Sequence, residues 1–169
     1  MTTPTPSDTA GTAPIRVLFV CLGNICRSPA AEAAFLHLAA EAGRDREFVV
    51  DSAGTGAWHI GKRADARMRR AAGRRGIEIR SVARQVTRTD FEDYDWILAM
   101  DASNLETLER MAPAASHARV RLFRDLDPDG HGRDVPDPYY GDMSGFDEVL
   151  DIVTRTARAL LAELTQPAR

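Results

Sequence analysis

The feature of this sequence that most constrains its fold lies between residues 15 and 36. The apolar run from Ile15 to Val20 predicts a buried strand, and the run from Pro29 to Leu36 predicts a helix. Only the segment 21–28 joins them. A strand, a tight loop and a helix start bring backbone N–H groups and the positive end of a helix dipole to one point. The sequence therefore predicts an anion site at this loop.

Two side chains of the loop suggest what the anion site does. Cys21 stands where the predicted strand ends, and Arg27 follows six positions later. A loop through the intervening residues can bring the thiol and the guanidinium to opposite sides of one bound oxyanion. A helix N-terminus and a nearby cation favour the thiolate, and the planar arginine fork fits two oxygens of a phosphoryl group. The alternative is an ordinary buried cysteine and a surface arginine, because this spacing alone arises by chance in many chains.

The other loop residues favour the functional interpretation. Gly23 allows the backbone to approach a ligand closely or to take a positive φ, and Asn24 tolerates the left-handed region. Ser28 is expected to cap the helix and to hydrogen-bond the sulfur of Cys21, while Pro29 suits the first helical position.

Composition limits the number of domains, the partners and the cellular compartment that can be expected. The length of 169 residues with 44% hydrophobic residues fits a single domain, expected at 15–169 after a disordered extension at 1–14. The net charge of -3 gives no case for nucleic acid or an anionic membrane. The start of the chain does not resemble a signal peptide, and no apolar run is long enough to span a membrane. The two cysteines, Cys21 and Cys26, both lie in the loop, which favours a reducing cytoplasm over a disulfide scaffold.

Strands and helices are predicted to alternate along the rest of the chain. Further strands are expected at 47–52, 94–100 and 119–123, with helices at 63–75, 87–91, 101–111 and 146–164. This alternation predicts a parallel sheet with helices on both faces and a ligand at the carboxyl ends of the strands. Cys21 stands at such an end.

The segment 61–90 is basic, with ten Lys or Arg residues against three acids. A solvated helix face explains this composition better than a docking surface for an acidic partner.

The long segment 124–144 offers an acid partner for the thiolate. A leaving alkoxide or phenoxide departs faster when a positioned acid protonates it. Two prolines flank Asp137 and restrict its backbone, so we favour Asp137 over Asp134 as this acid, with a simple turn as the alternative. Tyr139 and Tyr140 are candidates for an aromatic wall beside a phenyl ring.

A second loop, 53–61, has three glycines around Trp58 and His59, a composition typical of a functional loop. Trp58 is a candidate wall of the site mouth, or else a packing residue.

Together these motifs resemble the low-molecular-weight protein tyrosine phosphatases of the bacterial type. The resemblance rests on residues 21–29 and 137–141 and extends through 51–55, 58–59, 83–85 and 100–105. It implies a three-layer α/β/α fold with a four-stranded parallel twisted sheet, helices on both faces and no metal or other cofactor.

The resemblance also implies a mechanism. Cys21 would form a phosphocysteine intermediate, and Arg27 would bind the phosphoryl oxygens with the loop amides. Asp137 would protonate the leaving oxygen and then activate water, releasing inorganic phosphate. The implied partners are phosphotyrosine-containing proteins.

The resemblance assigns roles to further residues. Asn24, Ser28 and Ser52 match positions that hold the loop's shape. Cys26 matches a cysteine that can form a reversible disulfide with the nucleophile, and the alternative is a buried cysteine that only fills space. Where many family members carry a histidine, this chain has Ser81, so the support of the loop is expected to differ. The implied substrate-binding set comprises Leu22, Gly23, Asn24, Ile25, Cys26, Ser28, Trp58, His59, Tyr139 and Tyr140.

Two related activities remain as alternatives. Arginine phosphatases of this fold usually carry threonine where Ile25 stands and phenylalanine where Tyr139 stands. Thiol-dependent arsenate reductases usually relay through further cysteines, and none follows Cys26. A phosphate-binding module without catalysis is disfavoured by the joint presence of Cys21, Arg27 and Asp137.

Overall fold

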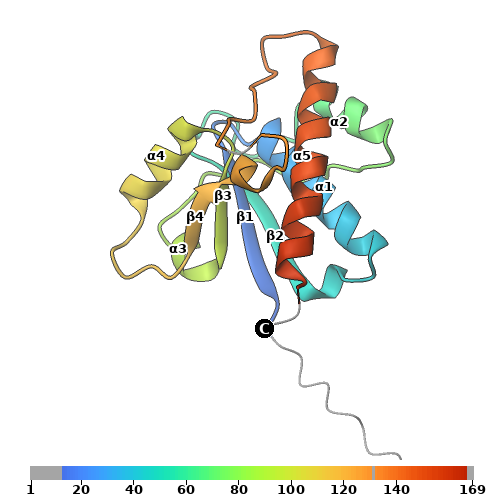
Figure 1. The fold of residues 1–169 in the computed structure, drawn as a ribbon. Coiled ribbons are helices and arrows are strands. Elements are labelled where there is room, and N and C mark those ends of the chain that lie inside the picture. Colours follow the sequence, from blue (N-terminus) through green and yellow to red (C-terminus); the bar gives the residue numbers. More distant parts are fainter. Residues whose placement is uncertain (1–12, 131, 167–169) are drawn as a thin grey trace, which may run out of the picture.

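The computed structural model describes residues 13–130 and 132–166 (Figure 1). The predicted N-terminal extension, 1–14, lies outside the described residues except for its last two positions.

Four strands form one parallel sheet in the order β2-β1-β3-β4. This arrangement confirms the predicted α/β class. The elements, in chain order, are β1 (Ile15–Cys21), α1 (Arg27–Glu41), the short 3-10 helix η1 (Asp45–Glu47), β2 (Phe48–Gly54), α2 (Ala66–Gly73), α3 (Asp90–Asp93), β3 (Trp96–Ala99), α4 (Ala102–Met111), β4 (Arg119–Leu122), the 3-10 helix η2 (Phe123–Leu126) and α5 (Met143–Leu164).

The helices form a layer on each side of the sheet. Helices α1 and α5 cover one face, and α3 and α4 lie on the other (Figure 1). Successive side chains of a strand point to opposite faces, so β1 contributes Val17 and Phe19 to the first core and Leu18 and Val20 to the second. None of these four side chains is exposed, so β1 is buried on both faces.

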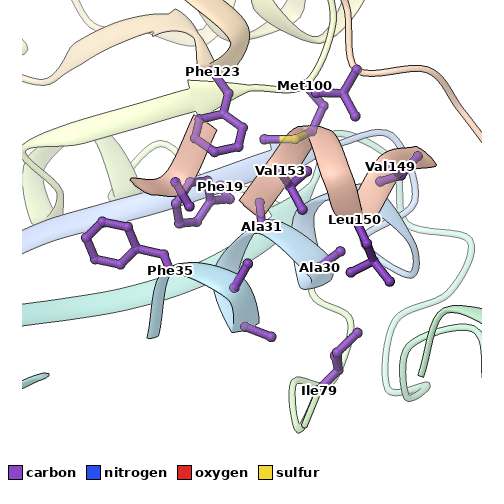
Figure 2. Packing of buried hydrophobic residues seen from close by; sticks show 14 of the residues in the cluster. Phe19, Ala30, Ala31, Phe35, Ile79, Met100, Phe123, Val149, Leu150 and Val153 are labelled. Atoms are coloured by element: carbon purple, nitrogen blue, oxygen red, sulfur yellow. The ribbon is translucent and has the colours of Figure 1, made fainter. Parts of the chain in front are cut away.

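Aromatic rings pack the larger core between β1, α1 and α5 (Figure 2). The centre of the Phe19 ring lies 5.1 Å from that of the Phe123 ring, edge to face, and 6.2 Å from that of the Phe35 ring. Full burial of such a side chain contributes roughly 1.5–3 kcal/mol. This packing holds α1, whose first turn follows the 21–28 loop, firmly against the sheet.

The sheet order places the loop after β1 at the point where the strand order reverses. β2 lies on one side of β1 and β3 on the other, so the chain leaves β1 where the strand order changes direction. In open parallel sheets, ligands bind outside the carboxyl ends of the strands at this point. The fold therefore supports a binding site at residues 21–28.

Helix α2 is shorter than the predicted 63–75. It begins at Ala66 because Asp65 caps it, with Oδ1 accepting the backbone N–H of Arg67 at 2.8 Å. Arg63 is instead paired with Val82 in an isolated β-bridge. The helix ends at Gly73, and Gly76 then takes a φ of 74°, where glycine has no steric penalty.

The long segment 124–144 is anchored at a buried carboxylate. Asp127 accepts hydrogen bonds from Nε of Arg124 at 2.9 Å and from Nε of Arg155, on α5, at 2.7 Å. Arg124 also donates to the backbone oxygen of Asp134 at 3.0 Å. These contacts tie the beginning and the middle of the segment to the last helix.

No helix within the described ranges is long and apolar enough to cross a membrane.

Candidate active site

The 21–28 loop curls around the sulfur of Cys21. The Ser28 hydroxyl lies 3.0 Å from the sulfur, and the backbone N–H of Asn24 donates to it at 3.3 Å. Asn24 has a φ of 55°, which asparagine tolerates better than most residues. The predicted left-handed turn therefore falls on Asn24 and not on Gly23.

One predicted role of Ser28 is wrong. Helix α1 begins at Arg27, its N-cap residue is Cys26, and no side chain caps it. Ser28 and Pro29 are thus its second and third residues. The Ser28 hydroxyl instead hydrogen-bonds the sulfur of Cys21, as predicted, and accepts a hydrogen bond from the amide nitrogen of Asn24.

Asn24 is the centre of a buried hydrogen-bond network behind the loop. Its amide nitrogen donates to the hydroxyls of Ser28 at 2.8 Å and Ser52 at 2.9 Å. Its amide oxygen accepts the backbone N–H of Arg84 at 3.0 Å. No hydrogen bond of the described residues brings Ser81 into this network. The segment 81–84 therefore supports the loop through the backbone N–H of Arg84 and not through the side chain of Ser81.

Two glycines allow loops to approach each other at the site. A Cβ on Gly54, the last residue of β2, would lie 2.8 Å from the backbone oxygen of Leu22. A Cβ on Gly23 would lie 3.0 Å from Cδ2 of His59. Composition indicated a functional loop at 53–61. Only the contact with Leu22 shows that position 54 requires a residue without a Cβ.

The Arg27 guanidinium is nearly fully buried, with 5% of its side chain exposed. Nη1 donates to Oδ2 of Asp101 at 2.7 Å and to the backbone oxygen of Val135 at 3.1 Å, while Nη2 lies 3.8 Å from Oδ2 of Asp137. Burial lowers the pKa of Arg27, but the neighbouring Cys21, Asp101 and Asp137 outweigh it and raise the pKa overall. The charge is thus retained in a buried place because acidic groups surround it.

Asp101 is a site residue that the sequence motifs did not indicate. Its Oδ1 caps α4 by accepting the N–H of Asn104 at 2.7 Å, and its Oδ2 orients Arg27. Its place just after the carboxyl end of β3 is the feature that would have revealed it.

The structure distinguishes the two candidate acids. Asp137 lines the same cavity as Cys21 and Arg27, and its Oδ1 accepts the N–H of Tyr139 at 3.1 Å. Asp134 lies outside the lining, and its Oδ1 accepts the N–H of Ala102 at 2.9 Å at the start of α4. Only Asp137 of the two carboxyl groups is therefore at the cavity, and its role as the acid stays a prediction.

The cavity has a volume of about 430 Å³. Cys21 and Arg27 are buried within it, whereas Trp58 and Tyr140 at the rim are 70% and 94% exposed. The ring of Tyr139 lies 4.9 Å from that of Tyr140, edge to face. Asn24 and Ser28, predicted to bind substrate, and Ser52 do not line the cavity. The lining residues are Cys21, Leu22, Gly23, Ile25, Cys26, Arg27, Trp58, His59, Asp137, Tyr139 and Tyr140.

The second thiol of the cavity differs from the first in its surroundings. Both cysteines are free. Burial, followed by the charges of Asp65 and Cys21, raises the pKa of Cys26 well above the ordinary thiol value. Cys26 therefore stays protonated and is a poor nucleophile. Its reversible disulfide with Cys21 stays a prediction.

Glu32 on α1 is a buried carboxyl next to the loop-supporting network. Burial and the neighbouring Asp51 raise the pKa of Glu32 to about 8, although Ser52 and Arg84 act in the opposite direction. Arg84 itself donates from Nε to Oδ2 of Asp51 at 2.9 Å. Glu32 is thus protonated in the folded protein at neutral pH.

This protonation predicts a pH-dependent stability. The unfolded chain releases the Glu32 proton near pH ~4.3, whereas the folded protein keeps it up to about 8. Between these values the folded state binds more protons, so the free energy of unfolding falls as pH rises. Glu32→Gln should remove this slope. At pH ~8 its free energy of unfolding should exceed that of wild type by roughly a few kcal/mol.

Urea unfolding at acidic and mildly alkaline pH measures this effect. Glu148→Gln, at an exposed position of α5, is the matched control and should keep the slope. An unchanged slope in Glu32→Gln would contradict the assignment.

The described part of the chain contains no group of three or more His, Cys, Asp or Glu side chains that could hold a metal ion.

The fold and the site together define an α/β protein in which a thiol, a guanidinium and a carboxyl group line one cavity at the carboxyl ends of the strands. The family model for the low molecular weight phosphotyrosine protein phosphatases matches residues 16–169. The chain belongs to this family.

The chain is similar to proteins from distant organisms. The low molecular weight phosphotyrosine protein phosphatase of Schizosaccharomyces pombe is 47% identical, over 78% of this chain and 85% of its own. The low molecular weight protein-tyrosine-phosphatase of Streptomyces coelicolor is 44% identical, over 89% of this chain and 94% of its own. The solved structure of a Drosophila arginine phosphatase superposes with a TM-score of 0.86 at 31% identity, covering 91% of this chain and 100% of its own.

Proposed function

We propose that this protein hydrolyses phosphotyrosine in proteins through a phosphocysteine on Cys21, without a metal. The observation that carries the proposal is the meeting of Cys21, Arg27 and Asp137 in one cavity, although they come from the end of β1, the start of α1 and the segment before α5.

In the first step the sulfur of Cys21 attacks phosphorus, and the bond from phosphorus to the tyrosine oxygen breaks. Hydrogen bonding to the sulfur by the Ser28 hydroxyl and the Asn24 N–H stabilises the attacking thiolate. Arg27 and the loop N–H groups bind the phosphoryl oxygens as charge develops on them. Asp137 gives its proton to the departing phenolate oxygen.

In the second step the carboxylate of Asp137 takes a proton from water, whose oxygen attacks phosphorus. The sulfur–phosphorus bond breaks, inorganic phosphate leaves and the Cys21 thiolate is restored. Arg27 supplies the positive charge throughout, because Asp101 and the backbone of Val135 hold it in place.

The rim of the cavity supports an aromatic substrate. Trp58, His59, Tyr139 and Tyr140 flank the opening, and a phenyl ring entering between aromatic side chains gains stacking contacts. Phosphate on serine or threonine would leave this space unfilled.

Arginine phosphatase activity is the second candidate, favoured by the similarity to the Drosophila arginine phosphatase. Ile25 argues against it. This side chain lines the cavity but carries no hydroxyl with which to hydrogen-bond a water that attacks phosphorus.

The test compares peptides of one sequence that carry either phosphotyrosine or phosphoarginine, with a metal chelator present. We expect kcat/KM to be at least about a hundred-fold higher for phosphotyrosine, and the Cys21→Ser variant to be inactive with both. A preference for phosphoarginine would replace the proposed substrate, and loss of activity with the chelator would contradict the metal-independent mechanism. If the protein catalyses reduction of arsenate by an added thiol, it is an arsenate reductase, the other alternative that the sequence left open.

A further inference from the structure

Arg67 links two parts of the protein that meet at the cavity. It is the second residue of α2, and its guanidinium pairs with both oxygens of Asp65, from Nε to Oδ1 at 3.1 Å and from Nη2 to Oδ2 at 2.9 Å. Nη2 also donates to the backbone oxygen of Tyr139 at 3.1 Å. One side chain therefore connects the start of α2 with the segment that carries Asp137.

This link continues to the phosphate-binding loop on one side and to the general acid on the other. The backbone N–H of Asp65 donates to the backbone oxygen of Ile25 at 2.8 Å. The N–H of Tyr139 donates to Oδ1 of Asp137 at 3.1 Å. A continuous series of contacts thus runs from Ile25 through Asp65, Arg67 and Tyr139 to Asp137. Asp65 and Arg67 do not line the cavity.

Packing further restricts Arg67. Its guanidinium carbon lies 5.5 Å from the centre of the Tyr139 ring and 4.7 Å from that of Phe146, which is fully buried in α5. Arginine can stack on rings and donate in a planar fork at once, which lysine cannot do. Arg80, in the same basic segment, is 80% exposed and pairs with Glu78, so it provides a contrast.

Asp137 needs such an external support. Its side chain is 47% exposed, and its Oδ2 lies 3.8 Å from Arg27, beyond direct hydrogen-bonding distance. A displacement of about 1 Å in a reacting group costs on the order of a hundred-fold in rate.

We propose that Arg67 is a positioning residue that holds the Asp137–Tyr139 segment over the phosphate-binding loop and so sets the efficiency of proton donation. This inference rests on the proposed function of Asp137. Arg67 acts through Asp137 and does not bind the phosphoryl group.

The test measures single-turnover phenol release from aryl phosphates whose phenols differ in acidity. In Arg67→Gln, release of weakly acidic phenols should slow by about ten-fold, because these leaving groups need the proton most. Release of strongly acidic nitrophenols should change by less than about twofold. Competitive inhibition by inorganic phosphate should be unaltered, and Arg67→Lys should not restore the rate.

Two controls make the result specific. Arg80→Gln should leave release unchanged with every substrate. In an Asp137→Asn background, Arg67→Gln should slow release no further, because the group it positions is already lost. The melting temperature of each variant identifies a global folding defect.

Several outcomes would overturn the inference. Equal slowing for all leaving groups together with weaker phosphate inhibition would mean that Arg67 supports the phosphate-binding loop, and additive losses with Asp137→Asn would mean that it acts independently. If Asp137→Asn slows weakly acidic phenols but Arg67→Gln does not, the inference alone fails. If the wild type hydrolyses no aryl phosphate, or Asp137→Asn has no such selectivity, the proposed function fails with it.

Discussion

Replacing Cys21 by serine is expected to lower kcat for phosphotyrosine by about ten-thousand-fold or more. A serine hydroxyl occupies nearly the same place, but it stays protonated at neutral pH, so the covalent intermediate does not form. Cys21 ends β1 and is 3% exposed, and the substitution does not enlarge the side chain. The loop and the hydrogen bonds of Arg27 to Asp101 and Val135 should therefore persist, and inorganic phosphate should still bind.

Two measurements test this prediction together. Single-turnover assays give the loss in rate, and equilibrium binding of inorganic phosphate shows that the site remains folded. Mass spectrometry of acid-quenched wild type should detect a phosphoryl group on the peptide containing Cys21 and none in the variant. Turnover at the wild-type rate in Cys21→Ser would refute the nucleophile assignment.

Replacing Asp137 by asparagine should lower kcat/KM for phosphotyrosine by about a hundred-fold to a thousand-fold. The amide is nearly isosteric, and its oxygen can still accept the N–H of Tyr139, so the segment should stay in place. It cannot give a proton to the leaving oxygen. The loss should be largest for weakly acidic phenols, because these leaving groups need the proton most.

Kinetics with a phosphotyrosine peptide and with aryl phosphates whose phenols differ in acidity measure this effect. Asp134→Asn is the matched control, because Asp134 interacts with the start of α4 and does not line the cavity. The control should keep the wild-type rates. A loss in Asp134→Asn that grows as the phenol becomes less acidic, or the absence of such a loss in Asp137→Asn, would transfer the acid role to another carboxyl group.

The parts of the site that were predictable are those that depend on short stretches of chain. Cys21, Asn24 and Ser28 lie in one loop, where a strand end, a left-handed residue and a helix start restrict the geometry strongly. The boundaries of α2 were less predictable. Its composition is helical from 63 to 75, but the cap at Asp65 and the bridge between Arg63 and Val82 shorten it.

The amino-acid sequence by itself determined the alternating α/β architecture, the anion-binding loop and a short set of candidate acids, because periodicity and local backbone preference are properties of neighbouring residues. The tertiary structure alone decided that Asp101 holds Arg27, that the backbone of Arg84 supports Asn24, and that Arg67 connects to the Asp137 segment. These partners are 74, 60 and 72 positions apart. Only the register of the strands and the packing of α2 and α5 bring them within hydrogen-bonding distance, and spacing along the chain does not encode those contacts.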